Sequence, residues 1–126
     1  MNPESKHILI DAWGTPYPKV LDDVNFIENL LTLIAIATKS TIMKKISHKF
    51  EPQGVSSVVL VAESHISAHT YPEENYIAID IFTCGKTEPE NGIPIVEEVL
   101  RPIRIEVTEV VRGRRDGHSF SRIKRR

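Results

Sequence analysis

Side chains that can act as nucleophiles, acids or bases are concentrated between Val58 and Gly85. This stretch reads VVLVAESHISAHTYPEENYIAIDIFTCG, and it carries a hydroxyl at Ser64, an imidazole at His69 and the chain's only thiol at Cys84. A hydroxyl or thiol becomes an effective nucleophile when a base lies beside it. No Gly-x-Ser-x-Gly sequence surrounds Ser64, so a serine-hydrolase triad is not indicated. The chemistry of the stretch therefore depends on how its strands place these three groups.

Two apolar runs flank the polar residues and predict a β-hairpin. β-Branched residues dominate 58–62, which is typical of a buried strand, and apolar residues alternate with polar ones over 66–69. The loop is expected to begin at 63–65, and the 71–75 segment YPEEN is a turn signal before strand composition resumes at 76–82. We hypothesise that this hairpin returns Cys84 to the start of the 64–69 segment, where hydroxyl, imidazole and thiol would meet.

Each of these side chains also has an ordinary structural interpretation. A lone cysteine such as Cys84 is commonly a small buried apolar residue, and a strand histidine such as His69 is commonly a hydrogen-bonded structural group. His65 and His69 have metal-binding side chains but no firm third ligand, so no metal site is predicted. No glycine-rich phosphate loop is present. The residues alone support an α/β domain with a cluster of polar groups.

The rest of the chain predicts the helices and strands that would support the hairpin. Alternating apolar residues predict further strands at 6–13, 40–50 and 103–111. Asp22 or Asp23 can cap a helix that ends near Thr38, and Pro94 suits the first turn of a second helix at 95–100. This order indicates an α+β fold, a two-layer α/β sandwich in which a mainly antiparallel sheet carries its helices on one face.

Length and composition exclude several classes of protein. With 126 residues the chain is expected to form one domain with a core of its own, and its net charge of -1 gives no general attraction to nucleic acid or membrane. A single cysteine excludes an internal disulfide framework. The N-terminus lacks the pattern of a signal peptide, and no apolar run is long enough to span a bilayer. A cytoplasmic location without membrane or nucleic-acid partners is expected.

The C-terminal segment differs from the rest in charge. Residues 112–126 contain seven basic side chains against the single carboxylate of Asp116. We expect the single domain to cover 1–113 and residues 114–126 to form a solvated, mobile tail. The alternative is an RNA-binding module or a contact with an acidic partner, but Phe120 is the only aromatic residue of the segment, so base stacking has little support.

Several motifs together resemble the signature of the prokaryotic S-adenosylmethionine decarboxylase proenzymes. They are AESHIS at 62–67, HTYPE at 69–73, DIFTCG at 80–85, Lys6-His7 in the first strand and HKFEPQGVS at 48–56. The similarity runs from about Lys6 to Gly113, so it covers nearly the whole chain, and the combination of motifs is highly specific. The tail lies outside it.

The resemblance implies that the chain cuts itself between Glu63 and Ser64 into a β chain, 1–63, and an α chain, 64–126. In this family the serine hydroxyl attacks the preceding carbonyl, and elimination then converts the serine into a pyruvoyl group, the self-generated cofactor. By the same resemblance Ser56 and His69 are processing residues. Ser56 would stabilise the oxyanion, and His69 would accept the Cα proton during the elimination.

The resemblance also implies how a substrate would be handled. The pyruvoyl group formed from Ser64 would make a Schiff base with the substrate amine and accept electrons as CO2 leaves, and Cys84 would act as the proton donor. Phe50 and Tyr71 match positions where the family places aromatic groups beside the substrate's adenine, although simple core packing explains both equally well. Further candidates for substrate contact are Glu73 and Asp11.

One departure from the family pattern concerns the substrate. The family usually carries Trp where this chain has Tyr71. The function implied is decarboxylation of S-adenosylmethionine, which yields the aminopropyl donor for spermidine synthesis. The alternative is a pyruvoyl-dependent arginine decarboxylase that makes agmatine. A non-enzymatic regulatory relative is less consistent with the presence of Ser56, Ser64, His69 and Cys84 together. The resemblance further implies a homodimer of cleaved protomers with two active sites near the interface.

Overall fold

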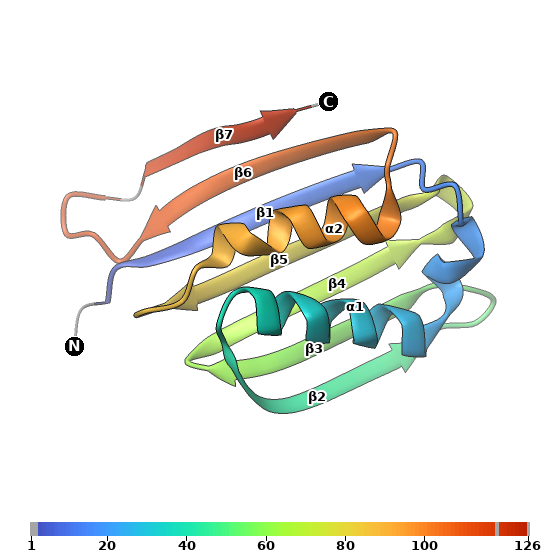
Figure 1. The fold of residues 1–126 in the computed structure, drawn as a ribbon, viewed down its shortest axis with the longest axis horizontal. Helices are drawn as coiled ribbons and strands as arrows, with labels where there is room; N and C mark the ends of the chain where they lie inside the picture. Colours follow the sequence, from blue (N-terminus) through green and yellow to red (C-terminus); the bar gives the residue numbers. More distant parts are fainter. Residues whose placement is uncertain (1–2, 118, 126) are drawn as a thin grey trace.

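A computed structural model describes residues 3–117 and the backbone of residues 119–125, which form one antiparallel sheet and two α-helices (Figure 1). The strands are β1 (Ser5–Trp13), β2 (Thr41–Lys49), β3 (Val55–Ala62), β4 (Ser64–Tyr71), β5 (Tyr76–Cys84), β6 (Arg104–Arg112) and β7 (Ser119–Arg125). The helices are α1 (Val24–Ala37) and α2 (Gly92–Leu100), with short 3-10 helices at Pro18–Asp22, Pro72–Glu74 and Pro89–Asn91.

The strands lie in the order β2-β3-β4-β5-β1-β6-β7, and each neighbouring pair is antiparallel. The hairpin predicted from 58–85 is the β4–β5 pair, in which Tyr71 lies opposite Tyr76 and His65 opposite Phe82. The first strand of the chain inserts between β5 and β6, so it pairs with two strands that are distant in sequence. As a result the N-terminal strand becomes part of the centre of the sheet.

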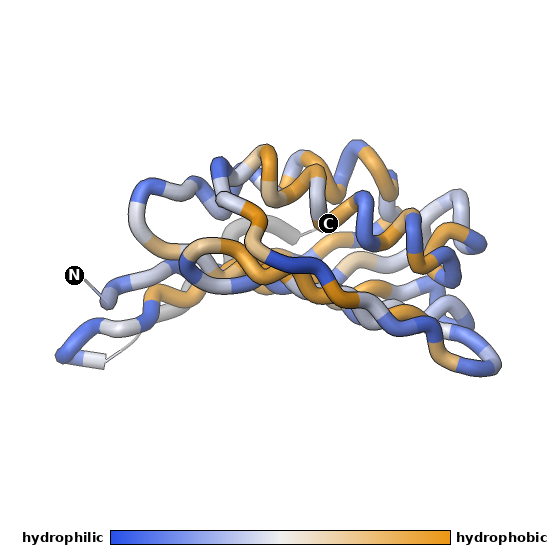
Figure 2. Tube along the Cα trace, turned by 90° about the horizontal axis from the view of Figure 1, so that it is seen from below, coloured by the Kyte–Doolittle hydropathy of each residue, from blue (hydrophilic) through white to orange (hydrophobic). Residues whose placement is uncertain are grey.

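Both helices pack on the same side of the sheet, which confirms the predicted two-layer α+β fold (Figure 2). The core between the layers is aliphatic and includes Ile8 and Ile10 of β1, Ile66 of β4 and Ile34 of α1, all essentially without solvent exposure. Because side chains alternate along a strand, the residues between these point to the opposite face. We call that second face, which neither helix covers, the open face.

The helix ends follow local chemistry. The Asp23 side chain accepts hydrogen bonds from the backbone N–H groups of Asn25 and Phe26, so Asp23 is the predicted cap of α1. α2 begins at Gly92, three residues before the predicted start. A Cβ on Gly92 would lie 2.5 Å from Ile81 Cδ1, so the missing side chain lets the helix begin close against the sheet.

Two further expectations differ from the structure. The loop expected at 63–65 is reduced to a tight turn, because Ser64 and His65 already pair with Val61 and Leu60 of β3. The tail expected to be mobile contains β7, whose residues Ser119–Arg125 pair with β6. In the part of the chain that the structure describes, no helix is long and apolar enough to cross a membrane.

Candidate functional site

The turn between β3 and β4 places the Glu63–Ser64 peptide at one end of the sheet, beside the end of β5. The Cys84 thiol lies 3.2 Å from Glu63 Oε1 and 3.7 Å from the Glu63 carbonyl oxygen, and it donates to both. Ser5 of β1 pairs with Cys84, which brings the start of the chain to the same place. We call this region, defined by Ser5, Glu63, Ser64 and Cys84, the cleavage end.

The surroundings of Cys84 favour the protonated thiol. The hydrogen bond to the Glu63 carboxylate, together with burial, raises the pKa of Cys84 above its ordinary value. A thiolate at this position would face a negative charge and would be only partly hydrated. Cys84 therefore keeps its proton through neutral pH, as a proton donor must.

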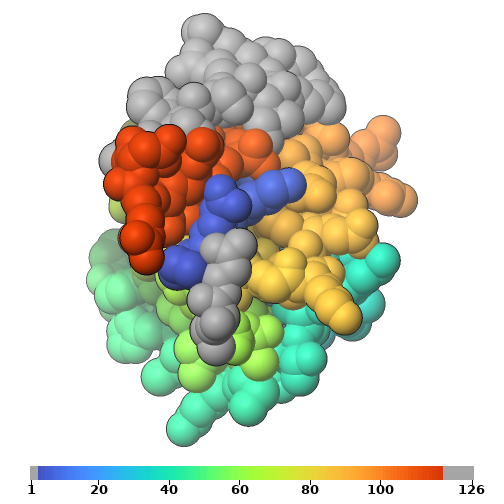
Figure 3. All heavy atoms as spheres, turned by 90° about the vertical axis from the view of Figure 1, so that its left-hand side faces the viewer, coloured from blue at the N-terminus to red at the C-terminus, as the bar shows by residue number. Residues whose placement is uncertain are grey.

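A cavity of about 570 Å³ opens at the cleavage end, between the start of β1, the end of β5 and the β3–β4 turn. Figure 3 views the molecule from this end, where the start of the chain, in blue, lies between the orange-red end of β6 and the yellow segment that follows β5. Its lining includes Lys6, Glu63, Cys84 and Arg114. Thr83 also lines it, and the buried Thr83 hydroxyl has no hydrogen-bond partner among the described residues. A cavity of this volume suits a small organic ligand.

The opposite end of the open face carries the second pair of predicted processing residues. Ser56 of β3 and His69 of β4 lie directly opposite each other in the ladder, and Ser56 Oγ is 2.8 Å from His69 Nδ1. The pair is exposed to solvent. A hydroxyl hydrogen-bonded to an imidazole is an arrangement in which the imidazole can take or return a proton.

Four side chains form a continuous row across neighbouring strands at this end. Arg104, Trp13, Tyr76 and Tyr71 lie opposite one another in the ladders of β6, β1, β5 and β4. The Arg104 guanidinium lies 4.5 Å from the Trp13 ring, and the Trp13–Tyr76 and Tyr76–Tyr71 ring centroids are 5.2 and 5.5 Å apart. The outer member, Tyr71, is 47% exposed. The row thus ends in an aromatic ring available for a ligand.

The remaining predicted contact residues surround this row. Asp11 accepts a hydrogen bond from the Tyr76 hydroxyl, and burial together with this bond raises the pKa of Tyr76. Phe50 is 45% exposed, and its ring lies against His48, with centroids 4.5 Å apart. Glu73, in the β4–β5 turn, is exposed to solvent.

We call the region defined by Phe50, Ser56, His69 and Tyr71 the aromatic end. Phe50 and Tyr71 do not pack in the core, because both residues are about half exposed to solvent.

The hypothesis that Ser64, His69 and Cys84 lie together is wrong for His69 within a single chain. The thiol does return to the turn that contains Ser64, but His69 is five residues further along β4, roughly 16 Å at about 3.3 Å per residue. Five is also an odd number, so the two side chains leave opposite faces of the strand. Within one protomer, the hydroxyl to be activated and the proposed base lie at different ends of the sheet.

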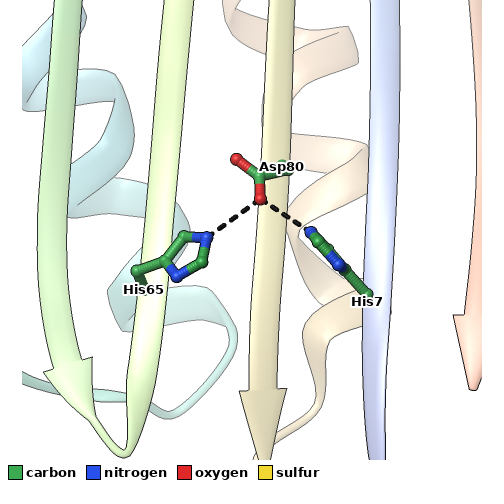
Figure 4. A group of neighbouring side chains, drawn as sticks. All are labelled: His7, His65 and Asp80. Atoms are coloured by element: carbon green, nitrogen blue, oxygen red, sulfur yellow. Dashed lines mark hydrogen bonds and ion pairs between the residues drawn. The ribbon is translucent and has the colours of Figure 1, made fainter. Parts of the chain in front are cut away.

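Between the two ends lies a hydrogen-bond network that the sequence did not reveal. Asp80 Oδ2 is 2.7 Å from His7 Nε2 and 3.0 Å from His65 Nε2, and Asp80 Oδ1 accepts a bond from Ser67 (Figure 4). Burial alone would raise the pKa of Asp80, but the bonds from His7, Ser67 and His65 outweigh it and lower the pKa to about 2. The carboxylate is therefore ionised at all physiological pH values.

Only part of this network can be predicted from the sequence. His65 and Asp80 fall on one face of the predicted hairpin, which follows from alternation. His7 joins them only because β1 pairs with β5, a contact between residues 73 positions apart that no local pattern predicts.

The chain resembles known proteins in sequence and in fold. A family model described as S-adenosylmethionine decarboxylase matches residues 6–113. The chain is 42% identical over 114 residues to an S-adenosylmethionine decarboxylase proenzyme of Caldanaerobacter subterraneus, covering 90% of this chain and 91% of that protein. It is 44% identical over 109 residues to a proenzyme of the same name from Methanococcus maripaludis, covering 86% and 88%.

A solved structure supports the same relationship. The crystal structure of the adenosylmethionine decarboxylase from Aquifex aeolicus is 32% identical and superposes with a TM-score of 0.80 over 90% of this chain and 94% of that chain. A Trypanosoma brucei structure of similar fold is 19% identical, with a TM-score of 0.62 over 83% of this chain and 45% of that chain.

Proposed function

Because the chain belongs to the S-adenosylmethionine decarboxylase family, we propose that it is a self-processing decarboxylase of S-adenosylmethionine. The observation that carries this proposal is the placement of the Glu63–Ser64 peptide in a tight turn, with the protonated Cys84 thiol beside Glu63 and a cavity lined by Glu63 and Cys84. The product would be decarboxylated S-adenosylmethionine, the aminopropyl donor for polyamine synthesis.

Processing begins with Ser64. Its hydroxyl attacks the carbonyl carbon of Glu63, the bond to the Ser64 nitrogen breaks, and an ester joins the two residues. Removal of the Ser64 Cα proton by His69 then eliminates Glu63 as a free carboxylate. The dehydroalanine that remains takes up water and releases ammonia, which leaves a pyruvoyl group at the start of the new chain. Ser56, hydrogen-bonded to His69, stabilises the oxyanion formed in the first step.

The residues around Ser64 fit the group that this chemistry would generate. Ser64 directly follows Glu63, which lines the cavity with Cys84, so a group formed from Ser64 would adjoin both the cavity and the proton donor. The pyruvoyl ketone supplies an electron sink when an amino acid loses CO2. Cys84 then donates its proton to the substrate Cα, a role to which its raised pKa is suited.

The separation of Ser64 from His69 requires a second protomer. One chain holds Ser64 and Cys84 at the cleavage end and Ser56 and His69 at the aromatic end, so neither end is complete alone. A twofold axis that brings two open faces together would set the aromatic end of each chain against the cleavage end of its partner, giving two equivalent sites.

The open face has the composition of such an interface. It exposes Leu9, Ile46 and Leu60 in addition to Phe50 and Tyr71, with Ile46 at 69% and Leu60 at 50% exposure. Apolar residues gathered on a face that no helix covers are typical of a surface buried by another chain. We therefore propose a homodimer in which the sheets face each other and each active site takes residues from both protomers.

In this arrangement the aromatic end recognises the substrate. Phe50 and Tyr71 both expose about half of their surface at this end, and a Cβ on Gly54 would lie 4.0 Å from Phe50 Cβ and 3.4 Å from the Thr70 backbone oxygen. A planar adenine can lie between the two rings, and either ring can attract the sulfonium by a cation–π interaction. Glu73 and Asp11 are placed nearby as acceptors for polar groups of the ligand.

The proposal is tested by intact mass and by CO2 release. Purified protein should contain two fragments that divide at Glu63/Ser64, the second lighter than the encoded segment by the replacement of its terminal amine with a ketone and blocked at its N-terminus. Carboxyl-labelled S-adenosylmethionine should then release labelled CO2, and Ser64→Ala should abolish both results.

Carboxyl-labelled arginine is the comparison substrate, because the family contains arginine decarboxylases and Tyr71 replaces the usual Trp. Release of CO2 from arginine alone would move the assignment to that activity. A single uncut chain without CO2 from either compound would overturn the enzyme proposal and leave the regulatory relative.

A further inference from the structure

The network around Asp80 has no role in the chemistry described so far, although it adjoins the reacting residue. Its members come from three adjacent strands, His7 from β1, Asp80 from β5 and His65 from β4 (Figure 4). His65 directly follows Ser64 in the sequence. The network is therefore one residue away from the bond that is cut.

Partners of His7 determine which of its nitrogens carries the proton. The Arg112 guanidinium, which can only donate, lies 3.3 Å from His7 Nδ1, while Nε2 faces the Asp80 carboxylate at 2.7 Å. Nδ1 therefore accepts and Nε2 carries the hydrogen that it donates to Asp80. A nitrogen that presents a hydrogen to Asp80 has no lone pair for a metal, so these residues form a hydrogen-bond network rather than a set of metal ligands.

Cleavage changes what holds the first residues of β4. In the uncut chain the turn at Glu63 anchors Ser64 covalently to β3. After cleavage Ser64 becomes a chain terminus, and terminal residues fray unless side chains or backbone bonds hold them. His65 is the first residue after the new terminus, and its 3.0 Å bond to Asp80 is the first side-chain contact that ties this terminus to the centre of the sheet.

The centre of the sheet is a firm anchor for such a tether. β5 lies between β4 and β1, with full ladders on both sides, so Asp80 is fixed by two neighbouring strands. Asp80 is also held by donors on both strands, Ser67 and His65 on β4 and His7 on β1. His65 further contacts the Phe82 ring, with centroids 5.8 Å apart, which limits its rotation.

We propose that Asp80, supported by His7, is a positioning residue that clamps His65 and thereby holds the pyruvoyl-bearing terminus in the active site after self-cleavage. The inference rests on the proposed function, because it concerns the terminus that cleavage at Ser64 creates. A reacting group displaced by about 1 Å loses up to roughly 100-fold in rate, so the clamp acts on turnover more than on binding.

The test compares variants that remove or keep the hydrogen bond. His65→Leu removes the donor, and Asp80→Asn replaces the charged acceptor with an amide whose nitrogen cannot accept, so three donors compete for one uncharged oxygen, whereas His65→Gln keeps an N–H donor at similar reach. We expect cleaved His65→Leu and Asp80→Asn to lose about 10- to 100-fold in kcat, with KM changed less than about threefold, and His65→Gln to recover most of the loss. Unchanged kcat in both disrupted variants would overturn the proposal.

Amide hydrogen exchange gives a readout that a general loss of stability would not mimic. Exchange at residues 65–67 should quicken about tenfold or more in cleaved Asp80→Asn, but much less when Asp80→Asn is combined with Ser64→Ala, where the chain stays continuous. Equal acceleration in both backgrounds would mean a structural role only. Dialysis against a chelator should leave wild-type kcat unchanged, and a loss restored by zinc would overturn the clamp in favour of a metal site.

Measurements on the wild-type protein distinguish a failure of the proposed function from a failure of the clamp. Its cleavage and CO2 release decide the proposed function before any variant is measured. If wild type cleaves and decarboxylates while all three network variants match it, the clamp alone fails.

Discussion

The two ends of the open face differ in what they supply and in how they are built. The cleavage end is a turn with a cavity, and it contains the peptide proposed to be cut and a thiol that keeps its proton. The aromatic end is regular sheet, where Ser56 and His69 pair across the ladder beside a row of stacked rings. A strand fixes the distance between them, so one protomer holds both sets of residues that the proposed chemistry needs but cannot bring them together.

The largest effect is expected when the two ends are inactivated on different chains. Ser64→Ala and His69→Ala should each be uncut and inactive alone. When they are co-expressed, a mixed dimer contains one intact site, so random pairing should restore activity to about a quarter of wild type. Two differently tagged chains allow the mixed dimer to be purified, and only its His69→Ala chain should be cleaved.

The opposite result would remove the need for a partner. If the co-expressed chains stay uncut although the tags co-purify, the site does not combine the cleavage end of one protomer with the aromatic end of another. The same tags provide the control, because wild-type pairs carrying both tags should retain full activity.

Cys84 tests the cleavage end by itself. Cys84→Ala should lower kcat for CO2 release by about 100- to 1,000-fold, since general acids contribute factors of this size. The raised pKa of the thiol keeps the proton in place at neutral pH, so wild-type activity should fall only on the alkaline side, as the thiol ionises. The pH profile of kcat measures this, and Cys84→Ser should lack the same alkaline limb.

An effect of Cys84→Ala below about threefold in kcat would assign the proton donor to another group. Cleavage is measured in parallel by gel electrophoresis, so that a loss of turnover is not mistaken for a loss of processing.

The sequence predicted the cleavage end better than its relation to the aromatic end. Alternation and turn residues were sufficient for the β4–β5 hairpin, which brings Cys84 to Ser64. Counting along the strand would also have shown that Ser64 and His69 lie far apart on opposite faces, because side-chain direction has a period of two. This odd spacing is a local feature of the sequence, and the hypothesis that placed Ser64 beside His69 overlooked it.

Other features were beyond local patterns. The pairing of β1 with β5 and β6 joins segments separated by some seventy to one hundred residues, and it alone brings His7 to Asp80. Gly92 starts α2 early because of close packing against Ile81, a contact that depends on the finished sheet. Strand β7 was hidden by the basic composition of its segment, which indicated solvation more than pairing.

Lowering the pH should destabilise the network around Asp80, which lies between the two ends, more than it destabilises either end. The pKa of Asp80 is about 2 in the folded protein, below its ordinary value near 4, so its stabilisation is complete above pH 4 and is lost as the pH falls towards 2. We expect the free energy of unfolding to fall by about 1 to 2 kcal/mol over this range. This is less than the full pKa shift implies, because the Asp80 side chain is 22% exposed to solvent. Urea unfolding at pH 2 to 5 should show this loss in wild type.

Asp80→Asn is the matched variant for that measurement. Its free energy of unfolding should be lower than wild type at pH 5 and should approach wild type near pH 2, where the carboxylate is being neutralised in both folded and unfolded chains. Parallel curves for the two proteins across this range would contradict the assignment of the acid sensitivity to Asp80.

The smallest effect is expected at Tyr71, and it identifies the ligand of the aromatic end. Tyr71→Trp restores the residue usual in the family and enlarges the ring beside the adenine, so KM for S-adenosylmethionine should fall about two- to threefold, whereas Tyr71→Ala should raise it about tenfold, the loss of one aromatic contact. Neither change replaces a group proposed to cut the chain or to move a proton, so kcat should change less than KM. Arginine has no adenine to stack, and its KM should not follow this order. If the three proteins bind S-adenosylmethionine equally well, the exposed ring of Tyr71 serves the dimer interface instead, and dimer dissociation measured by sedimentation should then be the property that Tyr71→Ala changes.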